Sequence, residues 1–286
     1  MKFWLAVMFE DNSQLLDIAR SAEELGYTGI AVADHIVVPK GFASVHPSGE
    51  NPFDHTTNFP DPLTTIAAMS AVTSRLEFMP YVYILPMRDP FSVAKQAGTV
   101  AMLSGYRLKL GVGAGWLREE VSLIGHDPAA RGRRMDEMID VIRRFWDGGG
   151  MAEFHGEFYD FGPAGMYPAP TQHIPIWVGG KSDIALRRAA RNDGWLGMNY
   201  ALDEIEALLA KLHEERRRHV EMHGDNGRPF ETLVIANAMP DRGLYAKLEE
   251  QGVTSTVCLP WPVGDPAFAG LDAKRSALEA FASAYL

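Results

Sequence analysis

The chain has 286 residues, of which 47% are hydrophobic, and this is enough for one large α/β domain or two small ones. Its formal net charge is −10 and no basic block occurs, so we expect no nucleic-acid partner. No apolar run approaches the roughly 18 residues of a membrane span. The apolar N-terminus meets Glu10 and Asp11 without a cleavage site, which predicts a strand and not a signal peptide. Cys258 is the only cysteine, which excludes an internal disulfide and a cysteine metal cluster, and we expect a cytoplasmic protein.

Eight short apolar segments have the length and composition of β-strands, and helix-like segments lie between them. The expected strands are residues 2–9, 29–33, 76–82, 107–112, 174–178, 194–199, 232–238 and 255–259. Strands that alternate with helices favour a parallel sheet with crossover helices. Eight such units predict a single α/β domain, residues 1–286, folded as a (β/α)₈ TIM barrel.

Local signals mark the ends of several helices. Asp89 followed by Pro90 predicts a helix start, and Gly105 predicts its end. Asp203 and Glu206 have the spacing of a capping box before an apolar-periodic segment, so we expect another helix to begin there.

Two long segments interrupt this alternation. Residues 39–62 follow the second expected strand and are rich in Pro, Gly, His and Asn, whereas residues 147–173 form an insertion before the fifth strand. Loops of such length in a compact domain are usually functional or mobile. Because loops after barrel strands lie on the catalytic face, we interpret residues 39–62 as a substrate-side loop.

Residues 174–181 are the most informative stretch of the chain. An apolar run ends at Gly179 and Gly180, and Ser182 or Asp183 can cap the helix that follows. Backbone N–H groups and the helix dipole at such a strand–turn–helix junction suit a phosphate. Since diglycine turns are common, a plain turn remains the alternative.

Residues 111–116 read Gly-Val-Gly-Ala-Gly-Trp and only superficially resemble a dinucleotide-binding motif. Trp116 stands where that motif needs its third glycine, and no acidic residue ends a second strand about 20 residues later. We interpret the segment as a strand end whose glycines let a flat ring approach the backbone. A plain tight turn remains the alternative.

Asp34 and His35 end the second expected strand, where barrel strands deliver catalytic groups. A histidine there can donate a proton to a reacting centre, or accept one, near neutral pH. Asp34 is either part of the site or a residue that fixes a backbone turn.

Other histidines carry less information. His46 and His55 lie in the substrate-side loop, where they either touch substrate or are simply exposed. His219 and His223 are four residues apart, but the residues between them do not match the metalloprotease motif, so we expect a solvated helix end and no metal.

Several common catalytic motifs are absent from the sequence. It has no Walker A motif, no nucleophile elbow and no cysteine–histidine pair near a strand end. A site with one histidine, glycine-lined strand ends and a phosphate turn is the pattern expected when a cofactor carries the reactivity.

Together these segments resemble the bacterial luciferase-like monooxygenase superfamily, and within it the group that uses the deazaflavin coenzyme F420. The matching segments are residues 29–35, 75–90, 103–116, 131–137 and 168–180. They cover residues 1 to about 200 in the order typical of the superfamily. Beyond residue 200 the resemblance is mostly architectural.

The resemblance implies a coenzyme lying across the carboxyl ends of the strands. It places Asp34 and His35 near the deazaflavin ring, and a cis peptide between Tyr81 and Val82 beneath it. The remaining coenzyme-binding residues that it implies are Gly113, Ala114 and Gly115 along the ring, and Val178, Gly179, Gly180 and Lys181 at the phosphate.

The function implied is hydride transfer between the deazaflavin C5 and a small organic substrate, with His35 exchanging the proton and Asp34 orienting it. In the glucose-6-phosphate dehydrogenase branch a glutamate occupies the place of Trp116, so we expect a more apolar substrate here. Four aromatic side chains of the loop would close over that substrate, beside Trp116: Phe42, His46, Phe53 and His55.

Two alternatives stay open at this point. An FMN-dependent monooxygenase that uses molecular oxygen would share the barrel and the phosphate turn. A non-catalytic flavin-binding protein also occurs in the superfamily, although His35 and the strand-end glycines argue against it. Relatives are often dimers, but the sequence fixes neither a homodimer nor the identity of the small-molecule substrate.

Overall fold

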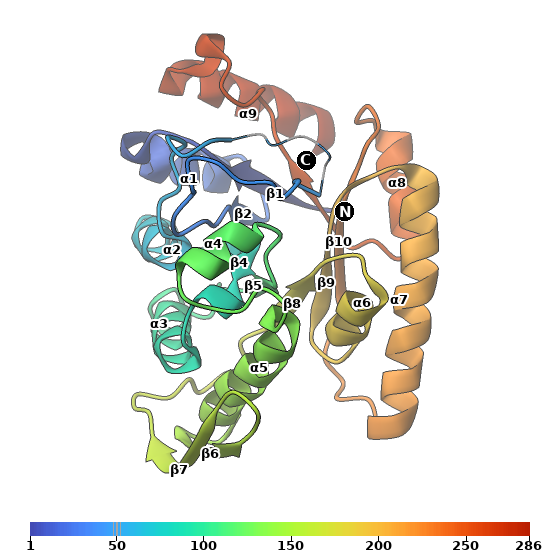
Figure 1. Ribbon diagram of the computed structural model, residues 1–286. Helices are drawn as coiled ribbons and strands as arrows, with labels where there is room; N and C mark the ends of the chain where they lie inside the picture. The colour runs from blue at the N-terminus through green and yellow to red at the C-terminus, as the bar shows by residue number, and fades with distance from the viewer. Residues whose placement is uncertain (48, 50, 52) are drawn as a thin grey trace.

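A nine-stranded parallel sheet forms the centre of the computed structural model, which describes residues 1–47, 49, 51 and 53–286 (Figure 1). The strands are β1 (Lys2–Val7), β2 (Gly29–Val32), β3 (Glu77–Pro80), β4 (Tyr83–Ile84), β5 (Leu110–Gly113), β8 (Ile176–Gly179), β9 (Gly194–Tyr200), β10 (Glu231–Ala236) and β11 (Ser255–Cys258). Their spatial order is β3-β2-β1-β11-β10-β9-β8-β5-β4.

The two ends of this sheet meet and nearly close it into a barrel. The third expected strand, residues 76–82, contains β3, and β4 lies just beyond its expected end, after the cis peptide between Tyr81 and Val82. β4 pairs with β5, and a parallel bridge between Phe78 and Leu108 joins β3 to the chain just before β5. The prediction of a (β/α)₈ barrel is therefore confirmed, with its third strand in two pieces.

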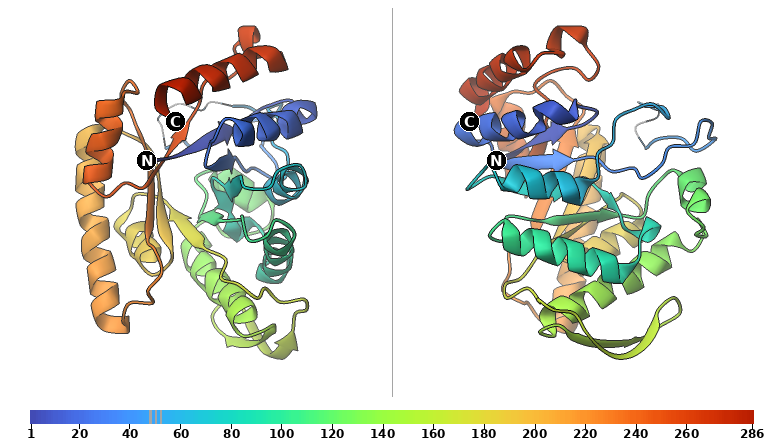
Figure 2. Two further views of the ribbon diagram at one scale, coloured as in Figure 1. Left: turned by 180° about the vertical axis from the view of Figure 1, so that it is seen from behind. Right: turned by 90° about the vertical axis from the view of Figure 1, so that its left-hand side faces the viewer.

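Helices surround the strands on the outside of the barrel (Figures 1 and 2). They are α1 (Leu15–Glu24), α2 (Pro62–Ser70), α3 (Pro90–Leu103), α4 (Arg118–Leu123), α5 (Arg131–Asp147), α6 (Asp183–Ala190), α7 (Leu202–His223), α8 (Arg242–Glu250) and α9 (Leu271–Tyr285), with short 3₁₀ turns η1 (Asn12–Gln14), η2 (Leu85–Met87) and η3 (Pro266–Phe268). Within the described part of the chain, none of these helices combines the length and the apolarity that crossing a membrane requires.

The expected helix ends are only partly correct. Asp89 caps α3 by accepting a hydrogen bond from the N–H of Ser92 at 2.8 Å, and Gly105 beyond its end has a φ of 64°. The prediction of a capping box at Asp203 is wrong, because α7 begins at Leu202. Its N-cap residue is Ala201, which has no side chain that could cap the helix. Asp203 instead lies in the first turn, where its charge favours the helix dipole.

Side chains fill the barrel interior, so the interior is a core and not a channel. The indole rings of Trp4 and Trp177 pack edge to face at 6.0 Å. Gly29 and Gly194 make room for them, because a Cβ atom there would lie 2.5 Å from Trp4 and 2.9 Å from Trp177. Above this core lies a partly buried layer, which we call the floor of the barrel mouth: Met8, Tyr81, Val82 and Ile235.

The insertion at residues 147–173 is not simply a loop. It contains an antiparallel hairpin of β6 (Met151–His155) and β7 (Asp160–Gly165). Phe161 stacks on Phe145 of α5 at 5.8 Å, so the hairpin has its own apolar contact on the outside of the barrel (Figure 2). By contrast, the substrate-side loop has no helix or strand among its described residues before α2 begins at Pro62.

Candidate active site

His35 lies just beyond the end of β2 and is 9% exposed. Its Nδ1 atom is 2.6 Å from Oε2 of Glu120, a completely buried side chain on α4. The other oxygen of Glu120 accepts hydrogen bonds from the backbone N–H groups of Ile36 and Val37, at 2.7 and 3.0 Å. One carboxylate therefore holds both the imidazole ring and the backbone that follows it.

Asp34 has different partners. Its two carboxylate oxygens each accept a hydrogen bond from Arg88 at 2.7 Å, and Oδ2 also accepts one from the N–H of Ile84 at 2.7 Å. These bonds connect the end of β2 to β4 and η2. The expectation that Asp34 orients His35 is therefore corrected, because Glu120 occupies the orienting position. Glu120 was not expected from the sequence, because it stands 85 positions from His35 in the chain. Its position shortly after the β5 glycines was the available signal.

Aromatic rings surround His35 on the side away from Glu120. The ring centroids of Phe53, Phe59 and Trp116 lie 4.7, 4.9 and 6.0 Å from the imidazole. Phe42 and His46 extend this aromatic cluster by contacting Trp116 at 5.8 and 5.1 Å. The rings are partly exposed, which is the burial expected of a binding surface and not of a core.

The aromatic cluster contains most of the expected substrate residues and two further phenylalanines. Phe9, at the end of β1, contacts both Phe53 and Phe59 at 6.0 and 5.1 Å, and neither Phe9 nor Phe59 was expected from the sequence. His55 is exposed and makes no contact with these rings among the described residues. The structure thus brings Phe42, His46, Phe53 and Trp116 to His35, but not His55.

The substrate-side loop is fastened at two places. Glu119, next to Glu120 on α4, accepts hydrogen bonds from the N–H groups of Ala43 and Ser44 and from the Ser44 hydroxyl, at 2.8, 3.1 and 2.6 Å. The Ser44 hydroxyl and these N–H groups lower the pKa of Glu119 to about 2. Farther along the loop, the Asn58 amide donates to Oδ1 of Asn12 at 3.0 Å. The loop and α4 project from the same end of the barrel (Figure 2).

The strand-end glycines have a role that the sequence did not suggest. A Cβ atom on Gly113 would lie 2.5 Å from Val82, and one on Gly179 would lie 2.9 Å from the same side chain. Likewise, a Cβ atom on Gly115 would lie 2.6 Å from Ile84. The interpretation that these glycines admit a flat ring directly onto the backbone is therefore corrected: they admit Val82 and Ile84. Val82, next to the cis peptide, then forms part of the floor.

The strand–turn–helix junction at β8 and α6 forms as predicted. Gly180 has a φ of 121°, and the Ser182 side chain caps α6 by accepting a hydrogen bond from the N–H of Ala185 at 3.2 Å. The indole N–H of Trp195 donates to the Gly180 carbonyl at 2.8 Å and fixes the turn. Lys181, however, forms an ion pair with Glu204 at 2.8 Å.

Another cation, Arg131, belongs to the neighbouring β5–α5 unit of the barrel. Arg131, at the start of α5, donates from Nε to the carbonyl of Gly115 at 3.1 Å, and β5 is the neighbour of β8 in the sheet. In the described part of the chain, Arg131 forms no ion pair with a carboxylate. Burial, together with the positive charge of Arg118, lowers the pKa of Arg131.

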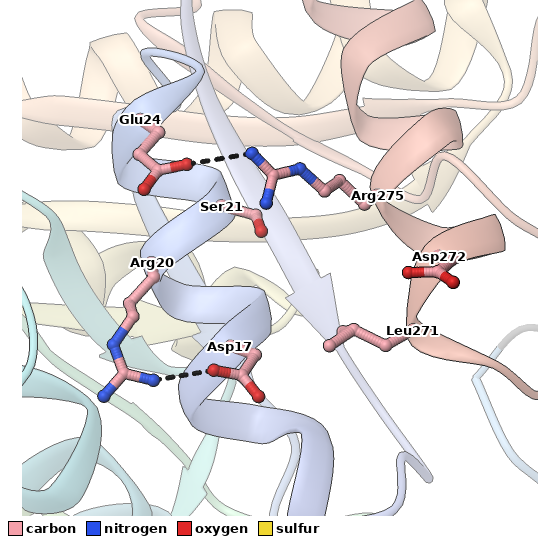
Figure 3. A pocket seen from close by; sticks show the side chains of 7 residues that line it. All are labelled: Asp17, Arg20, Ser21, Glu24, Leu271, Asp272 and Arg275. Carbon is pink, nitrogen blue, oxygen red and sulfur yellow. Dashed lines mark hydrogen bonds and ion pairs between the residues drawn. The ribbon is translucent and has the colours of Figure 1, made fainter.

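A shallow hollow between α1 and α9, of about 260 Å³, lies elsewhere on the molecule (Figure 3). Both of its arginines already pair with carboxylates, Arg20 with Asp17 at 2.6 Å and Arg275 with Glu24 at 3.2 Å. None of the expected site residues lines this hollow. The barrel mouth around His35 remains the candidate active site.

Comparisons with known proteins agree with this architecture. The family model described as luciferase-like monooxygenase matches residues 7–240. An uncharacterised protein of Mycobacterium tuberculosis is 39% identical over 288 residues, covering 99% of this chain and 98% of the relative.

Two solved structures show the same fold. The monooxygenase RslO1 from Streptomyces bottropensis has a TM-score of 0.73 at 17% identity. The coenzyme F420-dependent tetrahydromethanopterin reductase from Methanopyrus kandleri has a TM-score of 0.73 at 15% identity. Both comparisons cover 99% of this chain and 98% of the other chain. The protein is therefore a member of the luciferase-like monooxygenase family.

Proposed function

We propose that the protein is an F420-dependent oxidoreductase that transfers a hydride between the deazaflavin C5 and a small, uncharged, apolar substrate. The observation that carries the proposal is the placement of His35, a buried imidazole at a strand end, held by Glu120 and faced by aromatic rings. Hydride transfer to or from a carbon that bears oxygen also requires a proton donor or acceptor at that oxygen. His35 is the side chain that can serve there.

The barrel mouth fits a coenzyme with a flat ring and an anionic tail. Val82 and Tyr81 in the floor offer an apolar support for the ring, beside Ala114 at the end of β5. The N-terminus of α6, the Gly179–Gly180 turn and Arg131 together suit a phosphate. When bound, the coenzyme would supply the hydride acceptor or donor, and the protein would hold and orient both reactants. Because Lys181 pairs with Glu204, we assign the larger share of phosphate binding to Arg131.

The surroundings of His35 support an uncharged substrate. The imidazole is bounded by Phe53, Phe59 and Trp116, and both oxygens of the carboxylate that it contacts already accept hydrogen bonds. A charged substrate would lose its hydration there without gaining an opposite charge, which is unfavourable. Sugar phosphates are therefore poor candidates.

An FMN-dependent monooxygenase is the second candidate, since the phosphate turn and the floor suit both coenzymes and one structural neighbour is a monooxygenase. The similarity to an F420-dependent reductase and the Asp34-His35 pair favour F420. A non-catalytic flavin-binding protein would not need the buried pair of His35 and Glu120.

Two measurements test the choice of coenzyme. The first is the absorption spectrum of the protein purified from a host that makes both coenzymes, since flavin and deazaflavin maxima differ. The second is titration of the coenzyme-free protein with F420 and with FMN, followed by fluorescence. We expect F420 to bind at micromolar concentration, and binding of FMN alone would overturn the proposal. Bound coenzyme that no organic reductant or oxidant can turn over would instead favour the non-catalytic alternative.

A further inference from the structure

We propose that Glu120 is a positioning residue that holds His35 in the tautomer with Nδ1 protonated and leaves Nε2 as the atom that exchanges a proton with the substrate. The tautomer follows from the contacts of the resting protein. Only the assignment of Nε2 to the substrate proton rests on the proposed function.

The tautomer follows from counting donors and acceptors around one carboxyl group. Oε1 of Glu120 receives two backbone N–H groups, from Ile36 and Val37, and backbone N–H groups can only donate. Two such donors at this completely buried side chain favour the carboxylate, whose oxygens only accept. Oε2 is then an acceptor as well, so the 2.6 Å contact is a hydrogen bond donated by Nδ1–H of His35.

The same contacts fix the direction of the ring. Ile36 and Val37 directly follow His35, so Glu120 anchors the imidazole and its own backbone together. All described hydrogen bonds of the imidazole go through Nδ1. The described aromatic rings nearest to it are those of Phe53, Phe59 and Trp116, which line the proposed substrate position.

This arrangement gives each nitrogen one task. If an alcohol is the substrate, its oxidation would break the C–H bond and form the C=O double bond, and the bound deazaflavin would supply the hydride acceptor. The hydroxyl proton passes to Nε2 of His35. The resulting imidazolium keeps its Nδ1–H bond to the Glu120 carboxylate, which stabilises the positive charge. In the reverse direction Nε2–H returns the proton to the carbonyl oxygen.

The test is NMR of the histidine side chains in the coenzyme-free protein, labelled with ¹⁵N on its imidazoles. The chain has nine histidines, so His35→Gln serves to assign the His35 signals. For neutral His35 we expect a protonated Nδ1 and an unprotonated Nε2. An Nε2–H tautomer in the unmodified protein would overturn the proposal by itself, whichever coenzyme the protein binds.

Two neighbouring variants separate positioning of the ring from fastening of the loop. Glu120→Gln should abolish the single tautomer and give a mixture or the Nε2–H form. Glu119→Gln is the matched control, because Glu119 lies on the same helix and also accepts loop N–H groups, but does not contact the imidazole. We expect its His35 signals to stay those of the unmodified protein. Equal effects of both substitutions would show that only loop anchoring is involved and would contradict the proposal.

If Glu120→Gln does not fold, Glu120→Asp provides the second variant. It keeps the carboxylate but shortens the side chain by one methylene, so we expect a weakened Nδ1–H bond and a mixed tautomer population. Suppose that in Glu120→Asp the Ile36 and Val37 N–H groups no longer donate to residue 120, yet His35 still populates only the Nδ1–H tautomer. This result would overturn the assignment of Glu120 as the positioning residue. Because none of these spectra needs coenzyme or substrate, failure here is distinct from failure of the F420 proposal.

Discussion

Arg88 and Asp34 form a buried two-pronged ion pair in which each terminal nitrogen of the guanidinium lies 2.7 Å from a carboxylate oxygen. The guanidinium also lies over the Tyr83 ring, 3.8 Å from its centroid. The pair therefore ties the end of β2 to β4, beside the candidate active site, and its first role is to hold the barrel mouth together.

Replacing Arg88 with methionine should destabilise the protein strongly. The substitution leaves the completely buried Asp34 carboxylate without its cation, which typically costs about 3–5 kcal/mol. Urea unfolding measures the change in the free energy of unfolding. The control is Arg133→Met, because Arg133 forms an exposed pair with Glu157 and should change stability little. Equal stability of the two variants would contradict a structural role for Asp34.

Replacing Gly113 with alanine should damage the floor of the barrel mouth. The new methyl group would lie 2.5 Å from Val82, so the floor must shift, at a cost of about 1–3 kcal/mol. We expect coenzyme affinity, measured by fluorescence titration, to fall together with stability. Gly162→Ala in β7 is the control, since a Cβ there meets no atom within 4 Å. Unchanged coenzyme binding in Gly113→Ala would show that the Val82 position is not part of the ring site.

Trp116 should account for the quencher-accessible part of the tryptophan fluorescence. The chain has six tryptophans, and those other than Trp116 are at most 5% exposed. Acrylamide should therefore quench one component, and Trp116→Phe should remove it. Uncharged apolar ligands of the proposed site should also quench this component. A Trp116→Phe protein with the same accessible emission would place Trp116 away from the barrel mouth.

Asp193 should make stability depend on acid pH. Burial alone would raise its pKa, but the hydrogen bond from His173 and the charge of Arg143 outweigh burial and lower the pKa to about 2. Because the pKa is lower in the folded state than in the unfolded state, this group stabilises the fold fully above about pH 4. As the pH falls toward 2, the free energy of unfolding decreases by about 2 kcal/mol. Urea unfolding between pH 2 and 6 should show this loss, and Asp193→Asn should remove most of it. If Asp193→Asn loses as much stability between about pH 4 and pH 2 as the unmodified protein, other carboxylates cause the loss.

Most of the barrel could be predicted, because its strands are apolar runs of strand length that alternate with segments of helical periodicity. The residues that escaped prediction depend on contacts across the chain. Glu120 looks like any acidic residue on a short helix until the barrel brings α4 over the end of β2. The β6–β7 hairpin was missed because its strands are largely exposed and form no apolar run, and because its apolar partner, Phe145, lies on α5.

The candidate site was predictable to a similar extent. The position of His35 followed from its place at a strand end, and the turn at Gly179 and Gly180 followed from the strand–turn–helix pattern. The partner of His35 and the role of Gly113 did not follow, because both depend on side chains from other strands that fill the adjacent space. A single sequence cannot tell a glycine that admits a ligand from one that admits a neighbouring side chain.

Val82 lies between Gly113 of β5 and Gly179 of β8, directly beside the strands that close the barrel. The proposed support of the coenzyme ring and the closing strands of the barrel thus share one side chain. Changes of substrate preference are consequently more readily accommodated in the substrate-side loop, where side chains can vary without disturbing strand pairing. If the proposed function holds, the coenzyme would rest on side chains that also pack the barrel, whereas the substrate would face loop side chains, so directed evolution should begin in the substrate-side loop.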